Sequence, residues 1–372
     1  MTFKDVTEEQ CRTNPFAKLV PDQKIVEIPE YTLECGETLF NFPIAYKTWG
    51  KLNDKGDNVL VICHALSGSA DVADWWSELL GPGRAFDPEV SFIICINFLG
   101  SPYGSCSPVS INKKTGEPYG PSFPLATFKD DVGIQKMVLD DMNVSSVECV
   151  IGGSMGGMLA LEFISMFNNT GYIKKGVVLA TAARTSAWCI SWNITQRECI
   201  FNDPFFEDGL YYQTSNKPDG GLSAARMAAL LTYRSRDSFE TRFGGSNGAH
   251  RVDDKHSAHS YLQYNGKKFI NRFDANCYIS ISRKLDTNDL SRGRSVVSED
   301  GDPLVDVLKS ITTPTLVVGI ESDNLFTITE QKLLADNIPN AIFEKLDSNE
   351  GHDAFLLEFE KINGFISKFL LN

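Results

Sequence analysis

Short, unbroken apolar runs are the feature that most constrains the fold of this 372-residue chain. Six such runs occupy residues 58–63, 91–97, 147–152, 176–182, 315–320 and 341–347. Runs of this length, rich in β-branched residues, are typical of strands that are buried on both faces, as in a parallel sheet. The chain is therefore expected to build a largely parallel sheet that is covered on both sides.

Helical patterns lie between the runs. They occupy residues 127–142, 155–167, 327–338 and 353–371. Strands that alternate with helices predict a doubly wound, mostly parallel α/β sheet. Upstream, the segment 25–49 contains two stretches of alternating apolar and polar residues that meet at Gly36, which predicts an antiparallel hairpin.

The segment 183–305 interrupts the alternation with helical patterns rich in aromatic residues and arginine. We interpret it as a helical cap inserted into a catalytic domain made of residues 1–182 and 306–372. Within the cap, the polar, Gly-rich stretch 244–259 is expected to form a mobile loop, and 291–303 is a second polar stretch.

Charge and cysteine content exclude several classes of protein. The formal net charge of −13 argues against binding to nucleic acid or to an anionic membrane, because both need a basic face. No apolar run reaches the roughly 18 residues that span a bilayer, and the N-terminus has no apolar signal segment. Nine cysteines without a CxxC pair indicate neither a disulfide framework nor a metal site, so a cytoplasmic protein is expected.

Four glycines surround one serine in the stretch CVIGGSMGGMLALEF, residues 149–163. A phosphate-binding P-loop would need a lysine where Met158 stands, and the GxGxxG pattern of a dinucleotide site is absent. Residues 152–156 instead read G-x-S-x-G between a strand and a helix, which is the nucleophile elbow of the α/β-hydrolase fold. Glycines two before and two after the serine would avoid collisions in so sharp a turn. Ser154 is therefore the predicted nucleophile.

A serine nucleophile needs a general base, and this fold supplies its partners in the order serine, acid, histidine. The chain has five histidines: His64, His250, His256, His259 and His352. His64 precedes the serine, and the next three lie in the polar loop. His352 follows the last strand in a Gly-containing loop and is the predicted base.

The acid is expected just after the strand at 315–320, where Glu321 and Asp323 are the candidates. We favour Asp323, which lies further into the loop, whereas Glu321 directly continues the strand.

An oxyanion hole needs two backbone N–H groups. In this fold one belongs to the residue after the nucleophile, here Met155. The other comes from the loop after an early strand, where HALSG follows the first buried run and Leu66 is our choice. His64, at the start of this loop, is expected to be a structural residue.

Several motifs agree in order with one family. The stretches NVLVICHALSGSADVADWW, IGGSMGGM, ARTSAWCISWN, GLSAARMAALLTYRS and EGHDAFLLEF resemble the homoserine O-acetyltransferases of the fungal type. The similarity runs from about Thr13 to the C-terminus and fails only near 244–259 and 293–303. It implies an acetyl-serine intermediate, acetyl-CoA as co-substrate with no permanently bound cofactor, a role in methionine biosynthesis, and a homodimer formed through the cap.

The resemblance also implies how homoserine is held. Arg226 and Tyr233 match a cap arginine and tyrosine seven residues apart, and Asp353 matches the aspartate that meets the amino group. The residue types suit an amino acid, because a guanidinium binds a carboxylate through two bonds. Arg234 and Arg236 could serve in place of Arg226, Tyr233 could be a packing residue, and Asp353 could be an acid of the first helical turn.

The same catalytic residues also occur in proteins with other functions. A serine esterase or thioesterase has the same triad, and a sister O-acyltransferase could use serine as acceptor or a succinyl donor. A non-catalytic binding protein of this fold is a further alternative, against which the intact set Ser154, Asp323 and His352 speaks.

Overall fold

The computed structural model describes residues 2–244, 257–294 and 301–371. In this part of the chain one nine-stranded sheet has the strand order β1-β2-β3-β5-β4-β6-β7-β8-β9. Its first strands are β1 (Lys4–Asp5), β2 (Lys24–Thr32) and β3 (Thr38–Trp49), which pair antiparallel. The hairpin predicted around Gly36 is confirmed as the β2–β3 pair.

All six apolar runs form strands, and these pair in parallel. The strands are β4 (Val59–Cys63), β5 (Phe92–Ile96), β6 (Val147–Gly153), β7 (Gly176–Leu179), β8 (Thr315–Ile320) and β9 (Ala341–Leu346). The prediction of a mostly parallel sheet is therefore confirmed. β7 ends three residues before the predicted boundary, because Ala180 adopts a φ of 46°, which an extended strand cannot accommodate.

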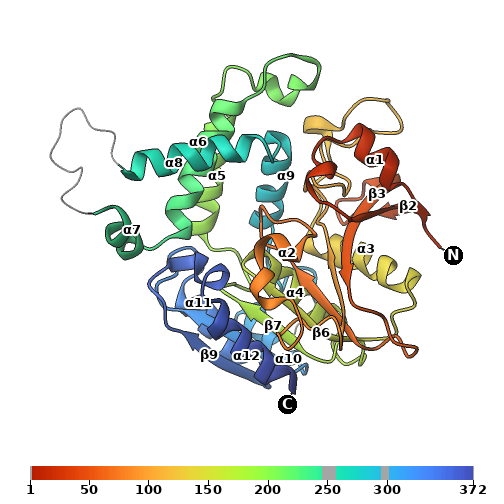
Figure 1. The fold of residues 1–372 in the computed structure, drawn as a ribbon, viewed down its shortest axis with the longest axis vertical. Helices are drawn as coiled ribbons and strands as arrows, with labels where there is room; N and C mark the ends of the chain where they lie inside the picture. The colour runs from red at the N-terminus through yellow and green to blue at the C-terminus, as the bar shows by residue number, and fades with distance from the viewer. Residues whose placement is uncertain (1, 245–256, 295–300, 372) are drawn as a thin grey trace.

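Helices cover both faces of the sheet, as Figure 1 shows. Alternate residues of one strand enter two separate cores: Val59 and Val61 of β4 belong to one, Leu60 and Ile62 to the other. The first core also receives α3 (Phe128–Asp141), α4 (Met155–Met166), α10 (Pro303–Ser310) and α11 (Ile328–Asn337). The second receives α2 (Val72–Trp75) and α12 (Phe359–Leu371). Two buried faces explain why the strand sequences do not alternate.

The single helix predicted for 353–371 is wrong. A 3-10 helix, η6 (Gly351–Leu356), is followed by a break and then by α12. A 3-10 helix has three residues per turn, so His352 and Phe355 lie on one side of it. Their rings are 5.4 Å apart, and both side chains are buried.

Between β7 and α10 the chain forms five α-helices in the described residues, which lie together beyond one end of the sheet (Figure 1). They are α5 (Ala187–Phe201), α6 (Asp219–Tyr233), α7 (Arg236–Phe243), α8 (Ser257–Ile270) and α9 (Ala275–Asp286). The predicted loop 244–259 lies mostly outside the described residues, but its last three residues already belong to α8. Part of the polar stretch 291–303 also lies outside them, and Pro303 begins α10.

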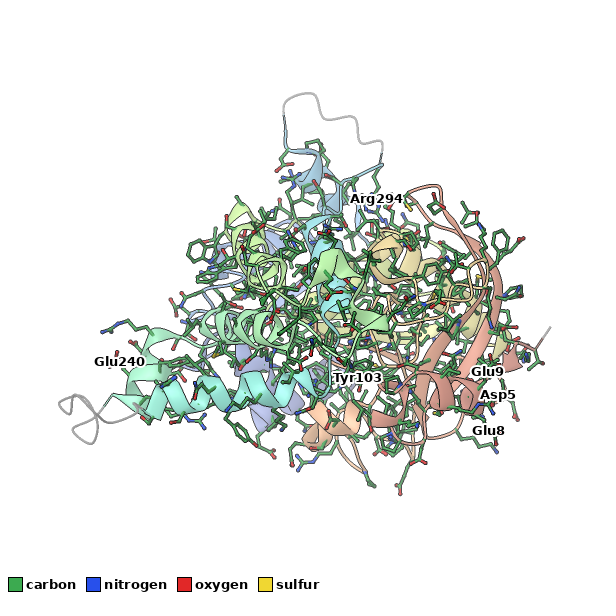
Figure 2. All side chains as sticks on the ribbon, turned by 90° about the horizontal axis from the view of Figure 1, so that it is seen from above. Asp5, Glu8, Glu9, Tyr103, Glu240 and Arg294 are labelled. Carbon is green, nitrogen blue, oxygen red and sulfur yellow. The ribbon has the colours of Figure 1, made fainter. Side chains whose placement is uncertain are left out.

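Tyr103, in the loop between β5 and α3, lies in the interior near the C-terminal end of α8 (Figure 2). Its ring packs edge-on against Phe273, which lies between α8 and α9, with centroids 5.8 Å apart. The loop after β5 and the turn between α8 and α9 therefore meet through a buried contact. No helix in the described ranges combines the length and the apolar character that crossing a membrane would need.

Candidate active site

Ser154 lies between β6 and α4 in a strained turn. Its φ and ψ are 57° and −126°, a region that residues with a side chain rarely occupy. The surrounding chain holds it there: the Ser154 N–H donates to the Leu179 carbonyl at 2.9 Å, and the Thr181 hydroxyl donates to the Ser154 carbonyl at 2.7 Å. The side chain thus stands at the end of the strand, as a nucleophile elbow requires.

The glycines of the turn allow backbone segments to approach closely. A Cβ on Gly152 would lie 2.1 Å from the Gly156 oxygen, and a Cβ on Gly156 would lie 2.0 Å from the Cys63 oxygen. Both are far inside van der Waals contact. The expected reason for glycine on either side of Ser154 is confirmed, with α4 and the end of β4 as the colliding neighbours.

Replacing Gly156 with alanine is expected to destabilise the protein by about 3 kcal/mol or more, because its Cβ would displace the backbone of β4. Gly364→Ala is the matched control: Gly364 is exposed in α12, and a Cβ there meets nothing within 4 Å. We expect this control to stabilise α12 by about 0.5–1 kcal/mol. Thermal unfolding measures both changes. Equal melting temperatures for the two variants would contradict this account of the turn.

His352 connects the serine to an acid. The Ser154 hydroxyl lies 2.8 Å from His352 Nε2, and His352 Nδ1 lies 2.7 Å from Asp323 Oδ2. Gly351 allows the histidine loop to reach this place: its φ is 73°, and a Cβ there would lie 2.4 Å from the Ser235 nitrogen in the cap. The three side chains come from loops after three different strands.

Asp323 is buried, and both of its carboxylate oxygens accept hydrogen bonds. Its Oδ1 accepts from the N–H groups of Leu325 and Phe326 at 2.8 and 3.0 Å, and Gln331 donates to Oδ2 at 3.2 Å. These bonds fix the carboxylate toward His352. Glu321, the alternative acid, is exposed and ion-paired with Lys345, so it does not reach the histidine.

Burial on its own would lower the pKa of His352. The charge and the hydrogen bond of Asp323, with the charge of Asp353, outweigh burial and raise this pKa above the ordinary value. The imidazole therefore accepts a proton more readily than a free histidine does, and the imidazolium that results is stabilised.

The two predicted oxyanion donors lie beside this group. Met155 is the first residue of α4, where a backbone N–H has no partner within its own helix. Leu66 lies in the loop after β4 and lines the cavity that contains Ser154 and His352. Neighbouring His64 is fully buried, its Nδ1 lies 2.9 Å from the Ala65 carbonyl oxygen, and its Nε2 accepts from the Phe98 N–H.

One cavity unites the predicted residues. It has a volume of about 380 Å³, part of it open to solvent, and is lined by Ala65, Leu66, Ser67, Ser154, Arg226, Tyr233, His352, Asp353, Phe355 and Leu356. The cap contributes Arg226 and Tyr233 from α6, and the Arg226 guanidinium carbon lies 5.5 Å from the Tyr233 ring centre. Arg226 Nη1 is 3.4 Å from the Ser67 hydroxyl. A cation and an anion, Arg226 and Asp353, thus face the same space as the serine.

The other two arginines considered for the carboxylate are placed elsewhere. Arg234 is ion-paired with Glu350, and its Nε lies 3.0 Å from Asp353 Oδ2. Arg236 is exposed. Neither lines the cavity. Burial raises the pKa of Asp353 above its ordinary value, although Arg234, His352 and Arg226 act in the opposite direction.

Four lining residues were not predicted: Ala65, Ser67, Phe355 and Leu356. Ser67 belongs to the HALSG stretch, so its place beside Leu66 was a usable signal. Phe355 falls within the helix predicted over 353–371, and no feature of the sequence there marked it as a lining residue.

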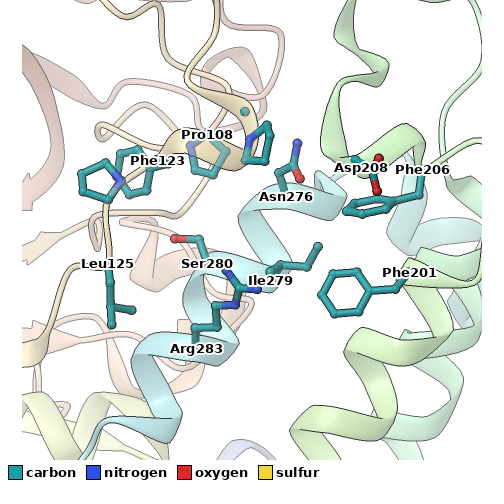
Figure 3. A pocket seen from close by; sticks show the side chains of 13 residues that line it. Pro108, Phe123, Leu125, Phe201, Phe206, Asp208, Asn276, Ile279, Ser280 and Arg283 are labelled. Carbon is teal, nitrogen blue, oxygen red and sulfur yellow. The ribbon is translucent and has the colours of Figure 1, made fainter.

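A second cleft lies along α9, and none of the residues that line the serine cavity lines it (Figure 3). Its lining includes Asn276, Ile279, Ser280 and Arg283 from α9, Phe123 and Leu125 on one side, and Phe201 and Phe206 on the other. It contains neither a histidine nor a cysteine. In the described residues, no three His, Cys, Asp or Glu side chains are grouped so that they could hold a metal ion.

Comparison with known proteins places these features in context. The sequence family described as alpha/beta hydrolase fold matches residues 58–359. Homoserine O-acetyltransferase of Saccharomyces cerevisiae is 48% identical, over 98% of this chain and 89% of its own. Homoserine O-acetyltransferase of Schizosaccharomyces pombe is 44% identical, over 99% of this chain and 90% of its own.

The fold is also found in a hydrolase. The crystal structure of an acetylester hydrolase from Corynebacterium glutamicum superposes with a TM-score of 0.84, over 96% of this chain and 98% of its own, at 22% identity. This likeness shows the shared fold alone. Acyl transfer to water and acyl transfer to an alcohol therefore occur on similar frameworks, and the acceptor must be argued from the cavity.

Proposed function

Because the chain belongs to the homoserine O-acetyltransferase family of the α/β-hydrolase fold, we propose that it transfers an acetyl group from acetyl-CoA to L-homoserine. The observation that carries this proposal is the single cavity in which Arg226 and Asp353 face Ser154. An α-amino acid carries a carboxylate and an ammonium group, and this pair of side chains matches both.

In the first half-reaction we assign the nucleophile to Ser154. Its oxygen bonds to the thioester carbon of acetyl-CoA while His352 Nε2 takes the hydroxyl proton. The carbonyl oxygen becomes an oxyanion that the N–H groups of Met155 and Leu66 receive. The carbon–sulfur bond then breaks, the thiolate takes the proton from His352, and CoA leaves behind an acetyl-serine.

In the second half-reaction homoserine takes the acetyl group. Its hydroxyl oxygen attacks the acetyl carbon while His352 accepts the hydroxyl proton, and a second oxyanion forms at the same two N–H groups. The bond to the Ser154 oxygen breaks, and that oxygen recovers a proton from His352. The products are O-acetyl-L-homoserine and free enzyme, and no permanently bound cofactor is needed.

We assign the homoserine carboxylate to Arg226 and its ammonium group to Asp353, with Tyr233 beside the arginine. These contacts direct the side-chain hydroxyl of the substrate toward Ser154. The cap, which supplies Arg226 and Tyr233, also covers the cavity and so protects the acetyl-serine from water.

The runner-up is an ester hydrolase, for which the shared fold is the only support. To separate the two, acetyl-CoA is supplied with and without homoserine, and acetate and O-acetylhomoserine are measured. We expect O-acetylhomoserine to account for most of the CoA released when homoserine is present. Equal acetate release under both conditions would sink the transferase proposal. Parallel assays with L-serine in place of homoserine, and with succinyl-CoA in place of acetyl-CoA, test whether the enzyme prefers another acceptor or another acyl donor.

Replacing Arg226 with alanine is expected to raise the KM for homoserine about 10- to 100-fold, because a charged hydrogen bond to the carboxylate is lost. Acetylation of the enzyme by acetyl-CoA should change little, since that step does not use the carboxylate. Arg236→Ala is the control, because this guanidinium is exposed and lies outside the cavity. Normal homoserine saturation in the Arg226 variant would show that the carboxylate binds elsewhere.

Three further expectations belong to this proposal. The chain divides into a catalytic domain of residues 1–182 and 306–372 and a cap of residues 183–305.

Two copies associate through the cap, where Trp188, Ile194 and Leu231 expose apolar surface on α5 and α6. The cytoplasm is the proposed compartment, and the absence of any disulfide among the nine cysteines, all of them described, supports it.

A further inference from the structure

The loop that carries Leu66 contains two linked peptide groups. The Ala65 carbonyl belongs to the same peptide as the Leu66 N–H, and the Ser67 carbonyl belongs to the same peptide as the Gly68 N–H. In a trans peptide the C=O and N–H groups point in opposite directions. The direction of the Leu66 N–H is therefore set by whatever holds the Ala65 oxygen.

Two donors hold the Ala65 oxygen. The Gly68 N–H donates to it at 3.0 Å, and His64 Nδ1 lies 2.9 Å from it. The Phe98 N–H donates to His64 Nε2 at 3.2 Å, so the ring proton must be on Nδ1, which then donates to Ala65. Burial lowers the pKa of His64 to about 4, so the ring stays neutral and keeps this tautomer.

Arg272 holds the second peptide from the cap. It lies in the turn between α8 and α9, and its Nη2 donates to the Ser67 oxygen at 2.6 Å. Its Nε donates to the Tyr103 hydroxyl at 3.1 Å, and Tyr103 is buried at the centre of the molecule (Figure 2). Two bonds from one planar guanidinium fix its orientation. The cation thus stands at one end of a chain of aligned peptide groups whose other end is the Leu66 N–H.

We propose that His64 and Arg272 are positioning residues that aim the Leu66 N–H at the oxyanion in both half-reactions. The order of bonds is Arg272 to the Ser67 carbonyl, the Gly68 N–H to the Ala65 carbonyl, and the Leu66 N–H to the oxyanion. Each bond polarises the next, so the guanidinium strengthens the final donor as well as orienting it. The cap is thereby coupled to catalysis as well as to substrate binding. This inference rests on the proposed function.

Two variants of His64 separate orientation from packing. Asparagine can place an amide N–H near the position of Nδ1, whereas glutamine places its amide near Nε2. His64→Asn is therefore expected to keep the bond to Ala65, and His64→Gln to lose it. We expect His64→Gln to slow both acetylation and deacetylation about 100-fold, and His64→Asn to recover at least about a tenth of the wild-type rates.

For Arg272, methionine removes charge and donors at similar length, and lysine keeps the charge and one donor. We expect Arg272→Met to slow both half-reactions about 10- to 100-fold and Arg272→Lys to recover part of the loss, with the homoserine KM changed less than threefold. Arg283→Ala is the control: it is an exposed arginine of the same cap segment that does not contact the loop.

The measurements are the burst of CoA on mixing with acetyl-CoA alone, the decay of the acetyl-enzyme on adding homoserine, and the melting temperature. Burst amplitude counts the folded active sites, so a variant that is merely less stable shows a smaller burst at the normal rate. Normal rates in Arg272→Met, or equal rates in His64→Asn and His64→Gln, overturn the proposal. If the wild-type enzyme forms no acetyl-serine, the proposed function itself fails, which is a distinct result.

Discussion

Ser154→Ala is expected to abolish formation of the acetyl-enzyme and to lower kcat by at least about 10⁴-fold. The alanine variant has no oxygen to attack the thioester, and His352 then has no hydroxyl from which to take a proton. On mixing with acetyl-CoA, the wild-type protein should gain the mass of one acetyl group, about 42 Da, on Ser154, and lose it when homoserine is added. Intact-protein mass spectrometry measures both events.

Ser191→Ala is the matched control for this experiment. Ser191 is exposed on α5, and its hydroxyl donates only to the Ala187 carbonyl within its own helix. The control should gain and lose the acetyl group as the wild-type protein does. An acetyl group that still appears on the Ser154 variant would mean that another residue is the nucleophile.

The fold was predictable because its signals are local. Each buried strand is a short apolar run, and each run can be recognised from six or seven neighbouring residues. Where the prediction was wrong, the deciding force was not local. The helix predicted over 353–371 has a suitable apolar pattern, but a 3-10 turn over Gly351–Leu356 precedes α12, and its residues His352 and Phe355 pack together in the buried site.

The candidate site was predictable to the extent that chain order reveals it. Ser154, Asp323 and His352 follow from a motif and a sequence order, and the structure brings them within hydrogen-bonding distance. Arg226, Tyr233 and Asp353 were selected by resemblance, and they line one cavity with the serine.

Arg272 could not be found in this way. It contacts Ser67 from a position 205 residues later in the chain, and although its stretch resembles the family, no motif there assigns this arginine a role. A contact of this kind depends on how the cap is seated on the sheet, which residue patterns within either segment do not encode.

Asp323→Asn is the prediction with the second largest expected effect, a fall in kcat of about 10³- to 10⁴-fold. The carboxylate accepts the proton of His352 Nδ1, which leaves Nε2 free to accept from Ser154. An asparagine that kept its oxygen toward the Leu325 and Phe326 N–H groups would turn its NH₂ toward the histidine. The ring would then carry its proton on Nε2, the tautomer that cannot act as a base toward the serine.

The same variant loses the negative charge that raises the pKa of His352, so burial would dominate and this pKa would fall. The acid limb of the rate profile should therefore move to lower pH while the plateau drops, a pair of changes that simple unfolding cannot produce. Glu321→Gln is the control, two residues away, exposed and paired only with Lys345 among the described residues. It should leave both the plateau and the limb unchanged. A Glu321 variant that lost activity while Asp323→Asn kept it would transfer the role of the acid to Glu321.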